Sequence, residues 1–169
     1  MKIDLTNYKE LSYDVFQKFS TQWAVACAGE LDDYRCLTLG WGMMGNLWSH
    51  PGSALTIYVT PARATWEYLQ KEEYFTVSFF PEEYREDLNI LGTKSSRDCD
   101  KVALTKLTPK VLSHGVGFEE ANLTFVCRKV YAHQFELDQI PEEMAKGMYS
   151  RVEPHWLYIG FVEDVEGNL

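Results

Sequence analysis

The chain carries Ala54-Leu55-Thr56-Ile57-Tyr58-Val59-Thr60, followed at once by Pro61-Ala62-Arg63-Ala64-Thr65. The first run is rich in β-branched and aromatic residues, which favour a strand. Pro61 has no N–H to donate and ends the strand, and residues 64–71 have the composition of a helix. The segment therefore predicts a strand that passes directly into a helix.

This junction is a candidate phosphate site. The first turn of a helix has backbone N–H groups without partners, and these groups point at an anion placed before the helix. Arg63 and Thr65 would add a cation and a hydroxyl at the same place. Another interpretation fits the same residues at least as well, in which Thr65 is the N-cap of the helix and Arg63 is solvated.

The sequence on both sides of this junction predicts further strands. Strand propensity and apolar runs predict further strands at residues 23–28, 35–42, 74–80, 121–135 and 156–165. Short helices are expected at 13–19 and 81–91, with Gly92 just past the end of the latter. Residues 1–22 form a lead-in and 42–51 an irregular connection. Strands with a few short inserted helices predict a mainly β (α+β) barrel rather than a parallel sheet with regular βαβ crossovers.

A second unusual segment is Thr38-Leu39-Gly40-Trp41-Gly42-Met43-Met44-Gly45, where a strand breaks into glycines around a tryptophan. Glycines let a ligand approach the backbone closely, and an indole with nearby thioethers suits a flat aromatic ring. A bulge or barrel corner with a core tryptophan explains the same pattern.

A third segment is Gly92-Thr93-Lys94-Ser95-Ser96-Arg97-Asp98-Cys99-Asp100-Lys101. It concentrates cations and hydroxyls in an otherwise acidic chain. Such a loop either holds an anion or is simply solvated, and composition does not decide between the two.

The charge and composition of the chain exclude several function classes. A length of 169 residues with 46% hydrophobic residues fits one packed domain, 1–169. The net charge of −9 argues against nucleic-acid binding and against docking on an anionic membrane, since both need clustered Lys and Arg. No stretch approaches the roughly 18 apolar residues of a membrane-spanning helix. The histidines lack the spacing of metal ligands on a helix, so no metal is expected.

The cysteines also lack a metal or redox motif. Cys27, Cys36, Cys99 and Cys127 include no pair at the spacing of a zinc knuckle or a redox dithiol. Free, partly buried thiols are therefore expected, and a cytoplasmic location fits them best.

The three unusual segments, in this order, resemble the flavin reductase-like family of FMN-binding split barrels, which includes flavoredoxin-like proteins. The similarity extends from about Trp23 to Val165. It is carried by motifs in the family's order: Thr38-Leu39-Gly40-Trp41-Gly42 with Leu47-Trp48-x-x-Pro51, Tyr58-Val59-x-Pro61-x-Arg63-x-Thr65, Gly92-Thr93-Lys94-Ser95-Ser96-Arg97-Asp98-x-Asp100-Lys101, and His155-x-Leu157-Tyr158-Ile159-Gly160-x-Val162.

The resemblance implies a six-stranded split barrel that binds FMN as a homodimer, at or near the subunit interface. It also implies electron transfer from NAD(P)H through FMN to a flavin or another acceptor. A flavin-binding carrier or sensor dimer that does not turn over NAD(P)H remains the alternative. The physiological acceptor, and the choice between NADH and NADPH, are not encoded in any motif.

The family's site residues transfer to matching positions of this chain. The resemblance implies that His155 acts on the nicotinamide side as the catalytic residue. The implied FMN contacts are Thr38, Gly40, Trp41, Gly42, Arg63, Thr65, Lys94, Ser95, Ser96 and Lys101. Two positions depart from the family pattern: Arg35-Cys36 stands where relatives often carry Asn, and Ser96 stands where Gly is common.

Overall fold

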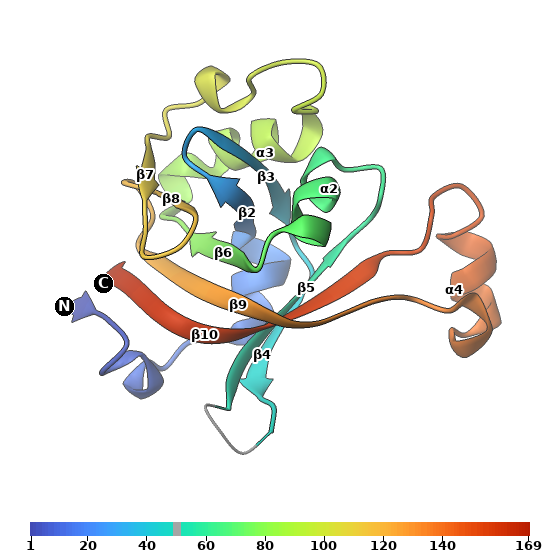
Figure 1. Cartoon of the computed structure of the whole chain (residues 1–169), viewed down its shortest axis with the longest axis horizontal. Coiled ribbons are helices and arrows are strands. Elements are labelled where there is room, and N and C mark those ends of the chain that lie inside the picture. Colours follow the sequence, from blue (N-terminus) through green and yellow to red (C-terminus); the bar gives the residue numbers. More distant parts are fainter. Residues whose placement is uncertain (49–51) are drawn as a thin grey trace.

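The structure is a computed structural model that describes residues 1–48 and 52–169 (Figure 1). Pro51 of the Leu47-Trp48-x-x-Pro51 motif lies outside these residues. The strands are β1 (Lys2–Ile3), β2 (Ala24–Glu30), β3 (Asp33–Leu39), β4 (Gly42–Asn46), β5 (Ser53–Val59), β6 (Tyr74–Phe79), β7 (Pro109–Val111), β8 (Val116–Phe118), β9 (Leu123–Gln134) and β10 (Trp156–Asn168). The α-helices are α1 (Val15–Gln17), α2 (Ala64–Lys71), α3 (Arg85–Thr93) and α4 (Glu142–Gly147). The 3-10 helices are η1 (Tyr8–Glu10), η3 (Glu82–Tyr84), η4 (Val102–Leu104) and η5 (Leu137–Gln139), and η2 (Lys18–Gln22) is a π-helix.

Eight strands form one antiparallel sheet in the order β3-β2-β6-β9-β10-β5-β4, with β1 paired to β10. Strands β7 and β8 form a separate ribbon. Strands β3 and β4 lie at opposite edges of the path, yet only Gly40 and Trp41 connect them along the chain. A connection this short keeps the two edges within about 11 Å of each other. The sheet must therefore curl into a barrel that stays open between β3 and β4.

The curl is supported by irregularities in the longest strand pair. The β9–β10 register shifts between Ile159 and Gly160 and again between Val162 and Asp164, and such bulges bend a sheet. A Cβ on Gly160 would lie 2.7 Å from the Cβ of Cys127 and from the Phe75 ring. Only glycine therefore fits where β10 passes over its neighbours.

Two apolar cores lie on opposite faces of the sheet. Successive β2 residues alternate between them: Ala24 and Ala26 belong to the core inside the curl, and Val25 and Cys27 belong to the core beneath α3. Helices α2 and α3 both contact β3. Figure 1 shows α4 at the far end of the long β9–β10 excursion, away from these two helices.

The expected mainly β architecture with short helices is confirmed, with eight strands in the main sheet where six were expected. The six predicted strands are β2, β3, β5, β6, β9 and β10. The expected lead-in contributes β1, which pairs with the end of β10. The helix at 64–71 has the expected bounds.

Three local expectations were wrong. Residues 42–46, expected as irregular, form β4 because their backbone pairs with β5, from Gly42 opposite Ile57 to Asn46 opposite Ser53. This pairing outweighs the weak strand propensity of glycine and methionine. The strand expected to reach Gly42 ends at Leu39. Gly92 lies inside the last turn of α3 rather than beyond it, because the helix continues to Thr93.

Candidate functional site

A cavity of about 200 Å³ opens at the split of the barrel. One wall is the end of β3 with the Gly40–Trp41 connection, and the other is the end of β5. Arg63 and His155 complete its lining. Three of the four family-like motifs of the sequence analysis therefore meet around one cavity, at the open edge between β3 and β4.

Trp41 and His155 form the mouth of this cavity. Their ring centroids lie 4.6 Å apart with the planes tilted by 40°, and Trp41 is 43% exposed. The Tyr149 hydroxyl lies 3.1 Å from Nδ1 of His155. Burial lowers the pKa of His155, so the imidazole is held in its neutral form near pH 7.

A larger cavity of about 700 Å³ adjoins the first and shares Gly40, Trp41 and Tyr58 with it. Its lining is mostly apolar and includes Met43, Met44 and the Phe19 ring. Its volume falls in the range of about 300–1,000 Å³ that is common for small-molecule sites. The two cavities together offer an aromatic and apolar space beside a strand backbone.

Gly42 stands between this space and the core. A Cβ on Gly42 would lie 2.3 Å from Cε1 of Phe19. The Phe19 ring is 3% exposed and packs edge-on against Phe79, so it has little room to withdraw. Packing therefore requires a glycine at position 42. The alternative to a ligand-binding role, a barrel corner, thus explains part of this segment.

Arg63 lines the smaller cavity together with Trp41 and His155. It is the N-cap of α2, so the alternative in which Thr65 caps this helix is wrong. Its Nη1 donates to the Gly92 carbonyl at 2.7 Å and its Nη2 to the Leu91 carbonyl at 3.2 Å. Among the described residues no carboxylate lies within ion-pair distance of this half-buried guanidinium. Three of its five N–H groups therefore remain for an anion.

The first turn of α2 offers further donors beside Arg63. The backbone N–H groups of Ala64 and Thr65 have no acceptor within residues 1–48 and 52–169. The Thr65 side chain is 1% exposed and lies under the same turn. Burial lowers the pKa of Arg63, although its charge persists at neutral pH.

Thr38 lines this cavity and also joins β3 to α3. Its Oγ1 donates to the Leu88 carbonyl at 2.5 Å, and a Cβ on Gly92 would approach its Cβ to 3.3 Å. The end of α3 is thereby fixed next to the cavity.

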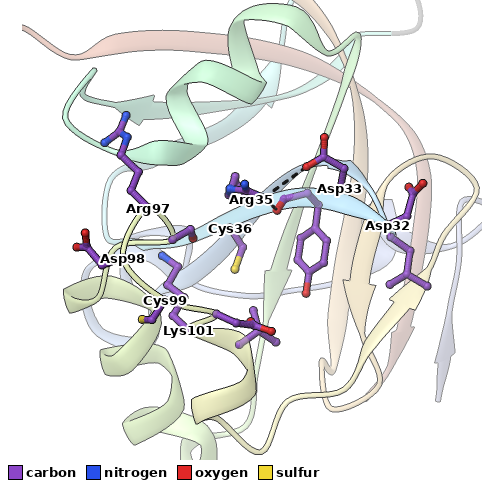
Figure 2. A pocket seen from close by; sticks show the side chains of 13 residues that line it. Asp32, Asp33, Arg35, Cys36, Arg97, Asp98, Cys99 and Lys101 are labelled. Atoms are coloured by element: carbon purple, nitrogen blue, oxygen red, sulfur yellow. Dashed lines mark hydrogen bonds and ion pairs between the residues drawn. The ribbon is translucent and has the colours of Figure 1, made fainter.

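The polar loop after α3 supplies the remaining expected residues. Lys101 is 3% exposed and donates from Nζ to the carbonyls of Leu91 at 2.7 Å and Lys94 at 3.4 Å. Ser95 accepts the Arg97 backbone N–H, and the Lys94 side chain is exposed. Ser96 and Lys101 line a different cavity, of about 520 Å³, between this loop and the β2–β3 hairpin (Figure 2).

The expected residues therefore fall into two groups. Thr38, Gly40, Trp41, Arg63 and His155 surround the cavity at the split, with Gly42 on the adjoining larger cavity and Thr65 in the first turn of α2. Lys94, Ser95, Ser96 and Lys101 lie beyond the end of α3, and Lys101 is joined to Arg63 through the Leu91 carbonyl that both side chains bond.

Sequence reasoning missed other residues of this region. Tyr149 approaches His155 from the α4 excursion, with no local motif to mark it. Phe135 stacks on Tyr58 at 5.7 Å and lines the apolar cavity. Arg97 bonds the Ala62 carbonyl and the Glu67 carboxylate, each at 2.7 Å, and so fastens the loop to α2. It could have been selected from its place in the Ser95-Ser96-Arg97-Asp98 motif.

The model of the flavin reductase like domain matches residues 16–169, which is nearly the whole chain. The chain belongs to this family. A sequence search of curated proteins gives no significant match. Within the described residues no helix is long and apolar enough to cross a membrane.

Several solved structures share the fold. Flavoredoxin from Methanosarcina acetivorans is similar with a TM-score of 0.66 at 17% identity, over 87% of this chain and 68% of that one. An FMN-binding protein from Thermus thermophilus, solved with bound p-hydroxybenzaldehyde, gives 0.68 at 18% identity, over 94% and 78%. An FMN-binding domain of a flavin reductases-like enzyme from Shewanella baltica gives 0.64 at 12% identity, over 93% and 76%. The expected split-barrel fold is therefore confirmed.

Proposed function

We propose that the cavity at the split of the barrel binds one FMN per subunit. The observation that carries the proposal is Arg63, a half-buried cation with no carboxylate partner among the described residues, placed beside the unpaired amides of Ala64 and Thr65. Such a cluster fits a phosphate. Thr65, Lys94, Ser95, Ser96 and Lys101 complete the phosphate side in this proposal.

The aromatic end fits the isoalloxazine. The backbone from Thr38 to Gly42 borders the adjoining cavities, and Trp41 offers its ring at their junction. A Cβ on Gly40 would lie 3.4 Å from the Phe19 carbonyl oxygen and 3.5 Å from the Trp23 ring, so this glycine lets the strand end pack against them. The residues present therefore suit a flat ring at one end of the site and an anion at the other.

The chain then acts as a flavin reductase-like oxidoreductase that takes electrons from NAD(P)H for a flavin or another acceptor. Bound FMN would supply the redox chemistry, and the protein contributes position and electrostatics. Neutral His155 orients the nicotinamide: in the tautomer whose Nδ1 accepts from Tyr149, Nε2 carries the proton and can donate to a carboxamide oxygen. Trp41 and His155 together exclude water from the mouth.

The proposed assembly is a homodimer. Apolar side chains are exposed around the larger cavity, with Phe16 at 85%, Met43 at 61% and Trp41 at 43%. A contiguous apolar rim of this kind suits a protein interface, and twofold pairs are the commonest assembly. We place the protein in the cytoplasm, because its cysteines are free thiols.

Binding is tested by titrating the flavin-free protein with FMN and following flavin fluorescence. We expect saturation at about one FMN per chain at micromolar concentration. A signal that does not saturate would refute the site.

Turnover is tested by anaerobic stopped-flow on the FMN-loaded protein with NADH and with NADPH. We expect bleaching of the flavin in wild type, and a weaker apparent affinity for the nicotinamide in His155→Ala. Tyr149→Phe is the matched variant, because it removes only the hydroxyl at Nδ1. No bleaching by either nucleotide would favour the carrier or sensor alternative, and identical kinetics in His155→Ala would remove the role given to His155.

A further inference from the structure

Two cysteines face each other directly across the β2–β3 hairpin. Cys27 is the register partner of Cys36, and both side chains are 1% exposed in the core beneath α3. Opposed residues in antiparallel strands have Cα atoms about 4.5–5.5 Å apart. A disulfide spans Cα separations of about 4.4–6.8 Å. The backbone therefore already holds this pair at bonding range, although both are free thiols here.

The two sulfurs are electrostatically unequal. A hydrogen bond from the Cys27 thiol lowers the pKa of Cys36, with further help from the nearby charges of Lys101 and Arg63, while burial and Asp100 oppose the shift. Burial raises the pKa of Cys27, and its bond to Cys36 raises it further. Cys36 is therefore the thiol of the pair that loses its proton more readily to give a thiolate, and Cys27 is the one that keeps its proton.

Lys101 is the cation placed to stabilise that thiolate. It is nearly fully buried, and no carboxylate within the described parts of the chain pairs with it. Its hydrogen bonds go to the carbonyls of Leu91 and Lys94. Burial lowers the pKa of Lys101, and the charge of Cys36 opposes this shift by favouring the protonated ammonium. A buried ammonium without a carboxylate partner favours an anion nearby, and the Cys36 sulfur lines the same cavity as Lys101.

The pair also has a route to small reagents. The 520 Å³ cavity is lined by Cys36 and Lys101, and by Cys99 at its exposed rim. Figure 2 shows the side chains of Cys36 and Lys101 in the space between β3 and the 96–102 loop. Cys127 has no such access, because it is fully buried in the other core.

We propose that Cys36 and Cys27 form a hydroperoxide-reactive dithiol site, in which the Cys36 sulfur is oxidised first and Cys27 then closes a cross-strand disulfide. In the first step the Cys36 thiolate attacks a peroxide oxygen; the S–O bond forms, the O–O bond breaks, and the departing oxygen takes up a proton and leaves as water or an alcohol. In the second step the Cys27 sulfur displaces the hydroxyl of the Cys36 sulfenic acid, which leaves as water with the Cys27 proton. Two thiols lose two electrons, and the hydroperoxide gains them.

The thiol chemistry needs no bound FMN, although Lys101 is shared with the phosphate side of the proposed flavin site. The experiment uses the reduced full chain, freed of reductant, with and without added FMN. One equivalent of hydrogen peroxide is added, remaining thiols are alkylated, and peptides are mapped without reduction. We expect two of the four thiols to be lost in both samples and a Cys27–Cys36 crosslinked peptide to appear. Four surviving thiols, or oxidation confined to Cys99, would overturn the proposal.

Variants test the roles of the individual groups. In Cys27→Ser the reaction should stop at a sulfenic acid on Cys36 that dimedone traps, and its absence there would overturn the order of steps. Lys101→Met should slow thiol loss about tenfold, whereas an unchanged rate overturns the role of Lys101. Cys127→Ala is the matched control, and it should lose two thiols at the wild-type rate. Cys99→Ser should still form the crosslink; failure to do so would assign the reaction to Cys99 instead.

Discussion

Arg63 and Lys101 donate to the same backbone oxygen, the Leu91 carbonyl, from Nη2 at 3.2 Å and Nζ at 2.7 Å. This carbonyl belongs to the last turn of α3, where the helix dipole is negative. Two cations that would otherwise repel are therefore held near each other by the end of one helix. The positive end of the candidate site is thus assembled before any ligand arrives.

Arg63→Ala should weaken FMN binding more than riboflavin binding, because only FMN carries the phosphate. Loss of a charge-assisted hydrogen bond costs about 1.5–3 kcal/mol, or roughly tenfold to a hundredfold in affinity. Fluorescence titration with the two flavins measures the difference. Arg128→Ala serves as the control, since Arg128 of β9 is paired with Glu163 of β10, and the variant should leave both affinities unchanged. Equal losses for FMN and riboflavin in Arg63→Ala would remove Arg63 from the phosphate.

Gly42→Ala should destabilise the fold by about 1–3 kcal/mol, since its Cβ would overlap the buried Phe19 ring. Gly45→Ala on the same strand is a matched control, because its Cβ would meet nothing within 4 Å. Its effect should stay within about 0.5 kcal/mol. Urea unfolding of the flavin-free proteins measures both values. Similar stabilities for the two variants would mean that Phe19 can move aside.

His155 should make the stability of the protein depend on pH in the acidic range. Burial lowers the pKa of His155 below its ordinary value of 6.5, so the unfolded chain binds the proton more readily than the folded chain. The free energy of unfolding should therefore be unaffected by this group above about pH 6.5 and should fall as the pH drops below it. Urea unfolding between pH 5 and pH 8 should show a shallower decline in His155→Gln than in wild type. Parallel curves would contradict the assignment.

The homodimer should depend on the apolar rim of the larger cavity. Light scattering of the wild type at micromolar concentration should give twice the chain mass of 19.5 kDa. Met43→Asp places a charge in the proposed interface and should shift the protein toward monomer. Leu104→Asp alters a similarly exposed side chain elsewhere and should remain dimeric. A wild-type mass of one chain with FMN bound would contradict the dimer.

The sequence pattern predicted those strands whose own residues have a strong strand propensity. The run from Ala54 to Thr60 is strongly strand-forming and became β5, and the helix after Pro61 has the expected bounds. Strand β4 could not be predicted this way, since its glycines and methionines adopt extended backbone only through pairing with β5. Likewise, β1 is too short to be recognised without β10 beside it.

The sequence by itself determined the strand-rich class, the strand-to-helix junction at Arg63 and the motifs of the flavin reductase-like family, because these depend on residues close together in the chain. Only the tertiary structure decided what those residues face. The curl that brings β3 near β4 opens the cavity between Trp41 and Arg63, and the end of α3 gathers Arg63 with Lys101. It also set Cys27 against Cys36 beside Lys101. These contacts are created by backbone pairing between strands and by burial of side chains. A local sequence pattern does not show either of these.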